Sequence, residues 1–303
     1  MRREVIIHIP LPYYSSDQLV RTLFAHRKFH NRRGTFVPQP KLYQNIARHC
    51  LKEEPSKQNF SFLRRSLLSG LPHGTKRIFL SFAGLPNSPL EIVSEEGILP
   101  DLSVLVGRIS YIFHDCDITI FVGIVNQGKL VSSLIQSNAT IRASLETAAS
   151  APSIYWSDAI GACKDEYKRV RFVVWRHEES VGLWPNIIRR AAGMPESVIP
   201  PGTFDMLVQK LNDEGIKHLR SLLSRTSKLS EDQVKKIIMT FLESKRFSRN
   251  LRTQIRIDGW TQDVISHFDE IYEDDVRQIY LDRDILLLGE NITTREKMER
   301  YRG

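Results

Sequence analysis

Short apolar stretches alternate with longer stretches of helical spacing along the first two thirds of the chain. The apolar stretches cover residues 5–9, 77–82, 118–123 and 170–175. Their nearly continuous apolar character predicts strands that are covered on both faces. Apolar residues recur every three or four positions over residues 19–24, 102–112 and 154–167, which predicts helices. Because strands alternate with helices, we expect an α/β fold with a parallel sheet covered by helices.

Helical patterns dominate after residue 175. A helix is predicted over residues 183–192, and Gly193 marks its end. The sequence Ile-Pro-Pro-Gly at residues 199–202 is a boundary signal. Further helices are predicted over residues 204–211, 214–224, 230–245 and 261–280, and Ser230 with Gln233 forms a candidate capping box. We therefore expect an α/β core over residues 1–198 and a helical C-terminal region over residues 199–303, packed on the core.

The net charge of +8 is unevenly distributed. Basic residues gather in residues 21–33 and 217–256, and an acidic segment follows in residues 258–275. The second basic segment is either a surface for an anionic partner or the electrostatic partner of the acidic segment. Nucleic acid is not an expected partner, because the charge is not accompanied by a recognisable reading motif.

The cysteine content and the hydropathy bear on location. Cys50, Cys116 and Cys163 are an odd and widely spaced set, without the spacing of a disulfide framework or of a metal site. The chain has no apolar stretch of about 18 residues that could cross a bilayer, and residue 1 leads directly into a predicted strand. We expect a cytoplasmic protein with no membrane span, no signal peptide and no metal.

The segment after the first predicted strand is the strongest candidate for chemistry. Ligands of open parallel sheets bind beyond the carboxyl ends of the strands. Residues 10–17 connect the first strand to a helix, and the free amides of a helix N-terminus attract anions. The hydroxyls of Ser15 and Ser16 would add donors. The alternative interpretation is that Ser16 or Asp17 only caps the helix.

Residues 8–12 and 124–134 resemble the approach to the donor loop and a later phosphate-binding corner of the nucleotide-dependent sulfotransferases, particularly their bacterial branch. The resemblance covers residues 4–195 and lies in the order and spacing of elements. It implies a sulfotransferase-like fold with a P-loop-NTPase-like core. It also implies 3′-phosphoadenosine 5′-phosphosulfate as donor, and a glycan or a small molecule as acceptor. The candidate donor-binding residues at these corners are Tyr13, Tyr14, Ser15, Ser16, Asp17, Lys129 and Ser133, and His177 at a later corner is the candidate catalytic base.

The chain departs from the family at the charged positions of the donor site. Tyr13 stands where the family has a loop Lys, and a tyrosine cannot neutralise sulfate and phosphate charge at neutral pH. Asp17 stands at the last Thr of the loop, where its carboxylate would repel an anion. Val125 replaces an Arg, the natural bidentate partner of phosphate. Lys129, one helical turn from Val125, is the candidate to compensate.

Two functions from different classes remain open. The first is a divergent sulfotransferase-like transferase, and the second is a catalytically inactive relative that acts as a binding or scaffold protein. The inactive relative would use the basic helices over residues 235–256 to bind an anionic partner. A glycosyltransferase or kinase with another donor is a third candidate, although the Asp115-Cys116-Asp117 sequence precedes its strand, where a metal-binding Asp-x-Asp motif would not be placed.

Overall fold

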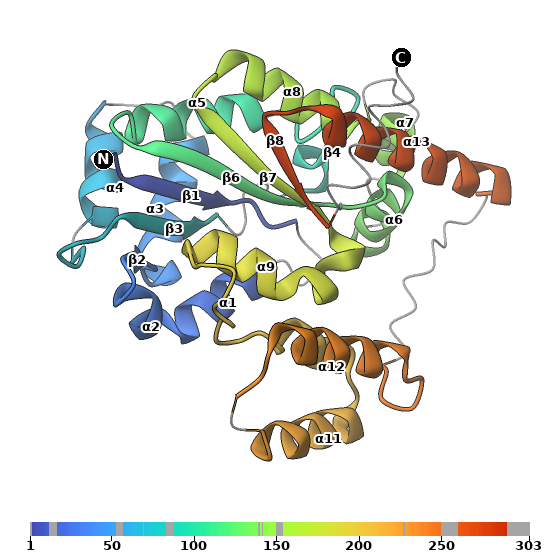
Figure 1. Cartoon of the computed structure of the whole chain (residues 1–303). Coiled ribbons are helices and arrows are strands. Elements are labelled where there is room, and N and C mark those ends of the chain that lie inside the picture. The colour runs from blue at the N-terminus through green and yellow to red at the C-terminus, as the bar shows by residue number, and fades with distance from the viewer. Residues whose placement is uncertain are drawn as a thin grey trace, which may run out of the picture.

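The computed structural model describes residues 2–11, 17–52, 57–68, 70–82, 88–138, 140, 142–149, 154–226, 228–249 and 260–289. Within these ranges, six parallel strands form the main sheet, in the order β2-β3-β1-β6-β7-β8 (Figure 1). The strands are β1 (Glu4–His8), β2 (Thr35–Phe36), β3 (Arg77–Ser81), β6 (Asp117–Ile124), β7 (Val170–Arg176) and β8 (Ile285–Leu288). A separate antiparallel pair consists of β4 (Val93–Ser94) and β5 (Gly97–Ile98). The expected α/β fold with a parallel sheet is confirmed.

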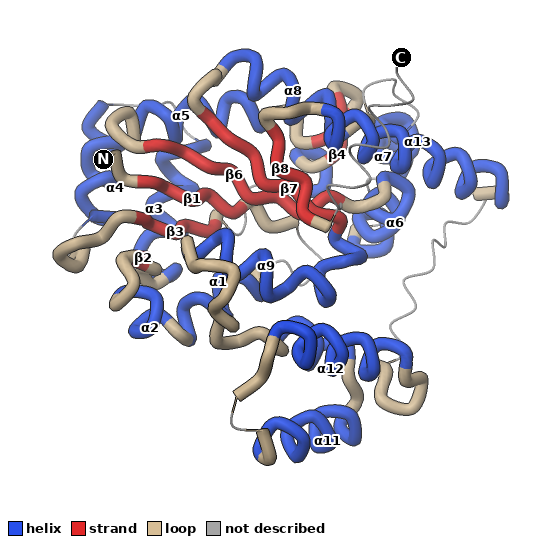
Figure 2. Tube along the Cα trace, viewed as in Figure 1, coloured by secondary structure: helices blue, strands red, loops and turns tan. Residues whose placement is uncertain are grey.

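Helices cover both faces of the sheet (Figure 2). The face that we call the α5 face is covered by α3 (Pro40–Lys52), α4 (Lys57–Leu68), α5 (Leu102–Ile112), α6 (Gln127–Ser137), α8 (Trp156–Glu166) and α13 (Gln262–Leu281). The opposite face, which we call the α9 face, is covered by α1 (Gln18–Ala25), α9 (Ser180–Ala192) and α10 (Asp205–Lys210). Alternate strand residues enter the two cores, for example Ile7 on the α5 face and Ile6 on the α9 face.

The four predicted strands are confirmed, each to within one residue at either end. The prediction of a purely helical region after residue 199 is wrong in one respect, because β8 lies in that region and pairs with β7 at the edge of the sheet. Its sequence, Ile-Leu-Leu-Leu, is apolar but only four residues long. The helix before it, α13, also packs into the core of the α5 face. The end of the chain that the structure describes therefore completes the sheet.

Two helix-capping signals predicted from the sequence are present in the structure. The helix α9 ends at Gly193, which adopts the left-handed conformation with φ of 62°, as expected for a C-terminal glycine. The predicted capping box also forms: Ser230 accepts a hydrogen bond from the Gln233 amide, and the Gln233 side chain accepts one from the Ser230 amide. It begins α12 (Glu231–Glu243).

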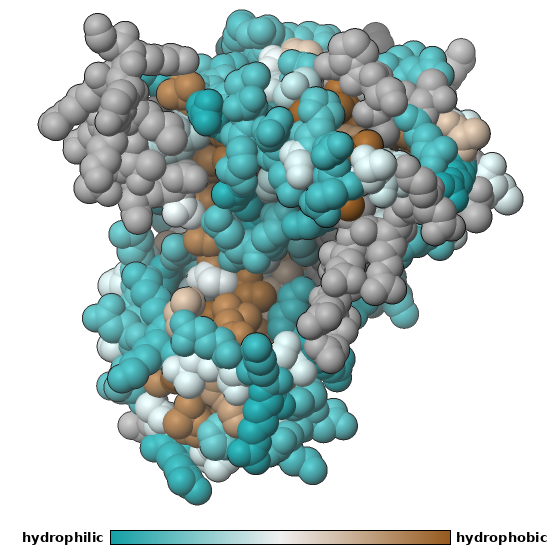
Figure 3. Space-filling model, turned by 90° about the vertical axis from the view of Figure 1, so that its right-hand side faces the viewer, coloured by the Kyte–Doolittle hydropathy of each residue, from teal (hydrophilic) through white to brown (hydrophobic). Residues whose placement is uncertain are grey.

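Two helices, α11 (Asp213–Ser224) and α12, form a lobe beside the α/β body (Figure 1). The buried side of the lobe joins the core of the α9 face through Leu219 on α11 and through Val234 and Ile238 on α12. Apolar residues gather in the recess between the body and this lobe (Figure 3). The short helices α2 (Arg27–Asn31) and α7 (Arg142–Ala149) complete the described α-helices.

The acidic helix α13 is anchored by a buried carboxylate. Asp275 is fully buried and accepts hydrogen bonds from the amides of Trp156 and Ser157, at 2.7 and 2.8 Å, and from Nε2 of Gln127 at 2.8 Å. It thereby caps the N-terminus of α8 and ties α13 to α6. Burial raises the pKa of Asp275 to about 6, against the opposing effect of these hydrogen bonds. The contacts described for the acidic residues of α13 are therefore with the α/β body, and not with the lobe formed by α11 and α12.

Candidate functional site

The carboxyl ends of β1 and β6 lie side by side in the middle of the sheet, with His8 opposite Phe121. The chain leaves β1 toward β2, on the side of β3, whereas it leaves β6 toward β7, on the other side. An open α/β sheet has a crevice where neighbouring connections leave in opposite directions, and ligands bind there. We therefore take residues 9–17, 125–133 and 176–180, which follow β1, β6 and β7, as the candidate site and call them the carboxyl edge.

The opening corner is described only in part. Tyr13, Tyr14, Ser15 and Ser16, four of the predicted donor-binding residues, lie outside the described residues. Asp17 precedes α1 and forms an ion pair with Arg21 one turn along the helix, and its side chain makes no capping hydrogen bond. The Asp17 carboxylate is therefore paired with a side chain of α1.

The floor of this corner is filled by aromatic side chains. His8 stacks between Phe79 and Trp175, with ring centroids 6.1 and 6.3 Å away, and its Nδ1 lies 3.0 Å from Oγ of Ser81. Burial lowers the pKa of His8 to about 3, so the ring is neutral at pH 7. A cavity of about 20 Å³ remains between His8, Trp175 and the start of α1. Among the described residues, little open space is therefore left beside His8 and Trp175.

Trp175 takes the space above β6 because residue 123 is a glycine. A Cβ at Gly123 would lie 2.9 Å from the indole of Trp175. The indole donates a hydrogen bond of 3.1 Å to Oγ of Ser180, which fixes its orientation. Bulky apolar packing therefore occupies the part of the crevice between β6 and β7.

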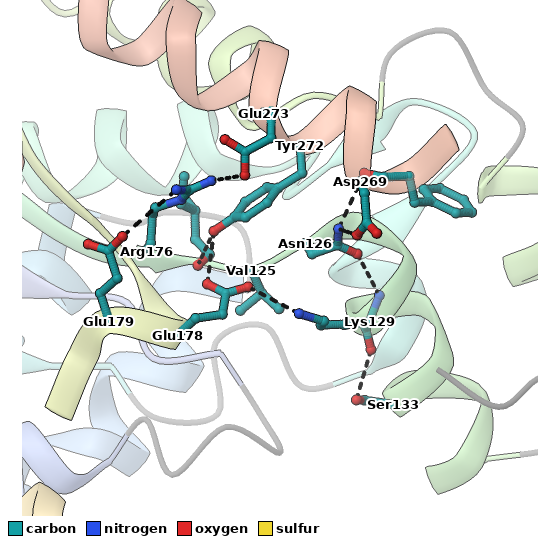
Figure 4. A network of polar contacts seen from close by, with 12 residues as sticks. Val125, Asn126, Lys129, Ser133, Arg176, Glu178, Glu179, Asp269, Tyr272 and Glu273 are labelled. Atoms are coloured by element: carbon teal, nitrogen blue, oxygen red, sulfur yellow. Dashed lines mark hydrogen bonds and ion pairs between the residues drawn. The ribbon is translucent and has the colours of Figure 1, made fainter. Parts of the chain in front are cut away.

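The second corner is organised by Asn126, which the sequence analysis did not single out. Its Oδ1 accepts a hydrogen bond of 3.1 Å from the Lys129 amide, which caps α6, and its Nδ2 donates to Asp269 at 2.9 Å (Figure 4). An Asn between a strand and a helix is a recognised capping signal and could have been identified from the sequence. The capped helix end faces α13.

Val125, which the sequence resemblance aligned with an Arg of the sulfotransferases, belongs to the core. Its side chain is 1% exposed, and its carbonyl accepts a hydrogen bond of 2.8 Å from Nε1 of Trp156. A charged side chain at this position would be desolvated without a partner. The position is therefore adapted to packing.

Lys129 and Ser133, both predicted to bind the donor, lie at this corner and make internal contacts (Figure 4). Nζ of Lys129 lies 3.9 Å from Oε1 of Glu178, a residue that follows β7. Oγ of Ser133 donates a hydrogen bond of 2.9 Å to the carbonyl of Lys129. The structure brings Lys129 to the carboxyl edge, where a neighbouring carboxylate opposes its charge.

The cation at the end of β7 is paired as well. Arg176 forms an ion pair with Glu273 on α13, lies 3.8 Å from Glu179, and stacks over the Tyr272 ring at 5.2 Å (Figure 4). The Tyr272 hydroxyl donates to Oε2 of Glu178 at 3.0 Å. Burial, with the Glu178 charge as a second cause, raises the pKa of Tyr272. The edge therefore carries at least as many carboxylates as cations around Arg176.

His177, the predicted catalytic base, lines the small cavity together with His8 and Trp175. Burial, with the nearby charge of Lys210 as a second cause, lowers the pKa of His177 to about 4. The imidazole is therefore neutral at pH 7. The structure places His177 at the expected corner, and its role as a base stays a prediction.

Lys210 is a cation of this corner that no sequence pattern indicated. It ends α10, a helix held against α1 by the hydrogen bond of 2.7 Å from Thr22 to Asp205 and by the contact of Gln209 with Gln18. Burial lowers the pKa of Lys210. The last turn of α10 thus brings a lysine beside His177 and toward the start of α1.

No group of three or more His, Cys, Asp or Glu side chains in the described residues could hold a metal ion. None of the described helices is both long enough and apolar enough to cross a membrane.

Comparison with known proteins finds similarity to a solved structure. No protein-family model matches the chain, and no curated protein does. The chain is similar to the crystal structure of a sulfotransferase from Alicyclobacillus acidocaldarius, with 11% sequence identity and a TM-score of 0.40. The similarity covers 79% of this chain and 97% of that chain. At this level of similarity, neither the donor nor the acceptor of that enzyme is transferred to this chain.

Proposed function

We propose that this chain is a sulfotransferase-like protein that acts as a binding or scaffold protein and does not transfer a sulfuryl group from 3′-phosphoadenosine 5′-phosphosulfate. The observation that carries the proposal is the contact between Lys129 and Glu178 at the carboxyl edge. Lys129 is the cation best placed to replace the missing Arg of the donor site, and its charge is opposed within the protein.

The electrostatic argument follows from the donor. It carries two phosphate groups and a sulfate, and binding it requires fixed cations or several oriented donors. The sequence has Tyr13 where the loop would need a cation, and the carboxylate of Asp17 at the last Thr position of the loop. Glu178 and Glu179 add negative charge at the same edge, and both side chains are exposed to solvent. A bound donor would therefore be repelled more than it is attracted.

The basic lobe is the surface that we assign to an anionic partner. Lys235 and Lys236 on α12 are exposed, and the apolar side chains of Met239 and Leu242 on the same helix are 51% and 41% exposed. Lys235, Met239 and Leu242 follow one another at intervals of four and three residues, so they lie on one side of the helix. A surface of this composition suits an acidic protein segment with some apolar side chains.

Calorimetric titration with 3′-phosphoadenosine 5′-phosphate, the product nucleotide of the donor, tests the absence of transfer. We expect no heat of binding at the carboxyl edge at millimolar nucleotide. Micromolar binding that is lost in Ser133→Ala would overturn the proposal, because it would place the nucleotide beside α6. Ser137→Ala, at the end of the same helix, is the matched control, since this hydroxyl also donates to a backbone carbonyl, that of Leu134 at 2.7 Å.

A second titration tests the lobe. With poly-L-glutamate as an acidic probe, the Lys235→Glu/Lys236→Glu variant should bind at least fivefold more weakly than the wild type at low salt. Unchanged affinity would rule out this surface. Arg27→Glu/Lys28→Glu, two charge reversals on α2, controls for the change in net charge.

The transferase remains the second candidate, and the position of Lys210 favours it. This lysine lies beside His177 and on the helix that packs against α1, so it could replace the cation that the loop lacks. The acceptor would then be a glycan or a small molecule. If this candidate is correct, Lys210→Met should weaken nucleotide binding at least tenfold, whereas Lys217→Met on α11 should leave it unchanged.

A further inference from the structure

A wide groove lies at the amino ends of the strands, the edge of the sheet opposite the carboxyl edge. Its volume is about 1050 Å³, and it is bounded by the first residues of β1, β3, β6, β7 and β8 and by the end of α9. Among the described residues, eight Lys and Arg residues and four Asp and Glu residues line it. We call it the amino-edge groove.

The floor of the groove is formed by polar residues at the start of the strands, on the α9 face. On this face Phe79, Phe121 and Val173 enter the core, and alternation places Arg77, Thr119 and Arg171 two residues earlier on the same side. Polar residues at the start of buried parallel strands depart from the apolar character expected of such strands. They leave a charged floor instead of a core.

The end of α9 contacts the floor of the groove at Arg77. The guanidinium of Arg77 passes over Gly193, where a side chain would collide with it, and Nη1 donates a hydrogen bond of 2.9 Å to the carbonyl of Arg190. The Thr35 hydroxyl donates to the Ala192 carbonyl at 2.7 Å. Arg77 and Thr35 thus satisfy the last carbonyls of the helix, so the groove wall is fixed.

Three of the four acidic residues of the lining lie close to basic side chains. Glu4 accepts hydrogen bonds from Nε of Arg77 at 2.8 Å and from Thr119 at 3.1 Å. Asp115 pairs with Arg64 at 2.7 Å, which lowers the pKa of Asp115 to about 2. Asp284 lies 3.6 Å from Lys164, which also pairs with Asp282. Because Arg64 does not line the groove, Asp115 is balanced from outside it, and the eight Lys and Arg residues of the lining outnumber its four Asp and Glu residues.

We propose that the amino-edge groove binds a small molecule that carries several phosphate groups. Exposed cations lie on opposite sides of it, for example Lys76 before β3 and Arg171 on β7, with Arg190 at the end of α9. A guanidinium group can donate two parallel hydrogen bonds to the oxygens of one phosphate group. Several guanidinium groups in one groove therefore favour a ligand with more than one phosphate group.

The size and the chemistry of the lining favour a small phosphate compound over a nucleic acid. The volume is at the upper end of small-molecule sites. The aromatic residues of the lining, Phe121 and Phe172, are each 1% exposed, so they offer no surface on which a base could stack. Recognition would therefore depend on phosphate groups. The proposal is independent of the proposed function, since the groove and the carboxyl edge lie at opposite ends of the strands.

Calorimetric titration of the full chain with inorganic tripolyphosphate at low salt tests this proposal. We expect saturable one-to-one binding that the Lys76→Glu/Arg171→Glu variant weakens at least tenfold. The matched control is Arg27→Glu/Lys28→Glu, which makes the same change in net charge on α2, outside the groove lining, and should alter the affinity less than twofold. The absence of binding, or an equal loss in both variants, would overturn the proposal.

Two further measurements keep the result unambiguous. Lys76 and Arg171 are exposed, so the variants should keep the thermal unfolding midpoint of the wild type, and Lys76→Gln/Arg171→Gln should give a smaller loss of affinity than the Glu variant. A duplex oligonucleotide serves as a second probe. If it binds in the groove and tripolyphosphate does not, the groove is a nucleic-acid surface and the proposal of a small ligand is wrong.

Discussion

Lys129 and Glu178 come from two different connections of the sheet, and their charged atoms lie 3.9 Å apart at its carboxyl edge. Lys129 lies in the first turn of α6, and Glu178 follows β7. Each side chain is 35% exposed, so the contact is partly screened by water. This contact contributes little to stability. It bears more on ligand binding, because Glu178 opposes the charge of Lys129 where an anionic ligand would need a cation.

A double-mutant cycle measures this contact directly. For Lys129→Met and Glu178→Gln, we expect a coupling free energy of about 0.2–1 kcal/mol in urea unfolding, the range of exposed ion pairs. The coupling should fall when salt is raised to about 0.5 M, since salt screens exposed charges. A coupling of zero at low salt would show that the charge of Lys129 is not engaged by Glu178.

Asp275 should be among the most important polar residues for stability. Asp275→Ala leaves the buried amides of Trp156 and Gln127 without their acceptor, and we expect a loss of about 2–4 kcal/mol in the free energy of unfolding. The neighbouring Asp274 is exposed and pairs with Arg277 at 3.3 Å, so Asp274→Ala should cost less than about 0.5 kcal/mol. Similar losses in urea unfolding of the two variants would contradict the anchoring role.

His30 should make the fold sensitive to acid. It is fully buried, its two ring nitrogens have no hydrogen-bond partner among the described residues, and burial lowers its pKa to about 4. The unfolded chain binds this proton more readily, so the stabilisation is complete above pH 6.5 and is lost as the pH falls from 6.5 toward 4. At pH 5.5 the loss is about 1.4 kcal/mol.

The variant His30→Phe removes this titration while keeping a ring in the core. Its free energy of unfolding should fall by about 1.4 kcal/mol less than that of the wild type between pH 7.5 and 5.5. An identical pH dependence in the two proteins would exclude His30 as a source of the acid sensitivity.

Gly123 should resist substitution because of Trp175. A Cβ at Gly123 would lie 2.9 Å from the indole, so Gly123→Ala should destabilise the fold by about 1–3 kcal/mol. Gly182 on α9 has open space around it, and Gly182→Ala should stabilise by about 0.5–1 kcal/mol through helix propensity. Thermal unfolding of both variants checks the pair, and a neutral Gly123→Ala would mean that Trp175 can move away from β6.

The centre of the sheet could be predicted from the sequence because its strands are continuous apolar runs. The edge strand β8 is four residues long, and a run of that length cannot be distinguished from the turn of a buried helix by its pattern. Gly193 and Ser230 were predicted correctly because caps are local features. Local signals and long apolar runs therefore account for what the sequence revealed of the fold.

The candidate site was less predictable, since its contacts join distant parts of the chain. Position in the sequence correctly placed His177 and Lys129 at the carboxyl edge. Their partners could not be inferred from the pattern of the sequence. Lys210 approaches His177 from a helix in the C-terminal region, and Glu178 reaches Lys129 from the connection after β7. Asn126 is the exception, as a local capping signal that could have been recognised.

Nucleotide binding at the carboxyl edge tests the central claim most directly. The titration with 3′-phosphoadenosine 5′-phosphate is best made on the Lys76→Glu/Arg171→Glu variant, so that the amino-edge groove does not contribute heat. We predict no binding up to millimolar nucleotide, because Lys129 and Arg176 at the carboxyl edge are opposed by Glu178 and Glu273. Micromolar binding that disappears on adding Ser133→Ala would contradict the account and establish a donor site.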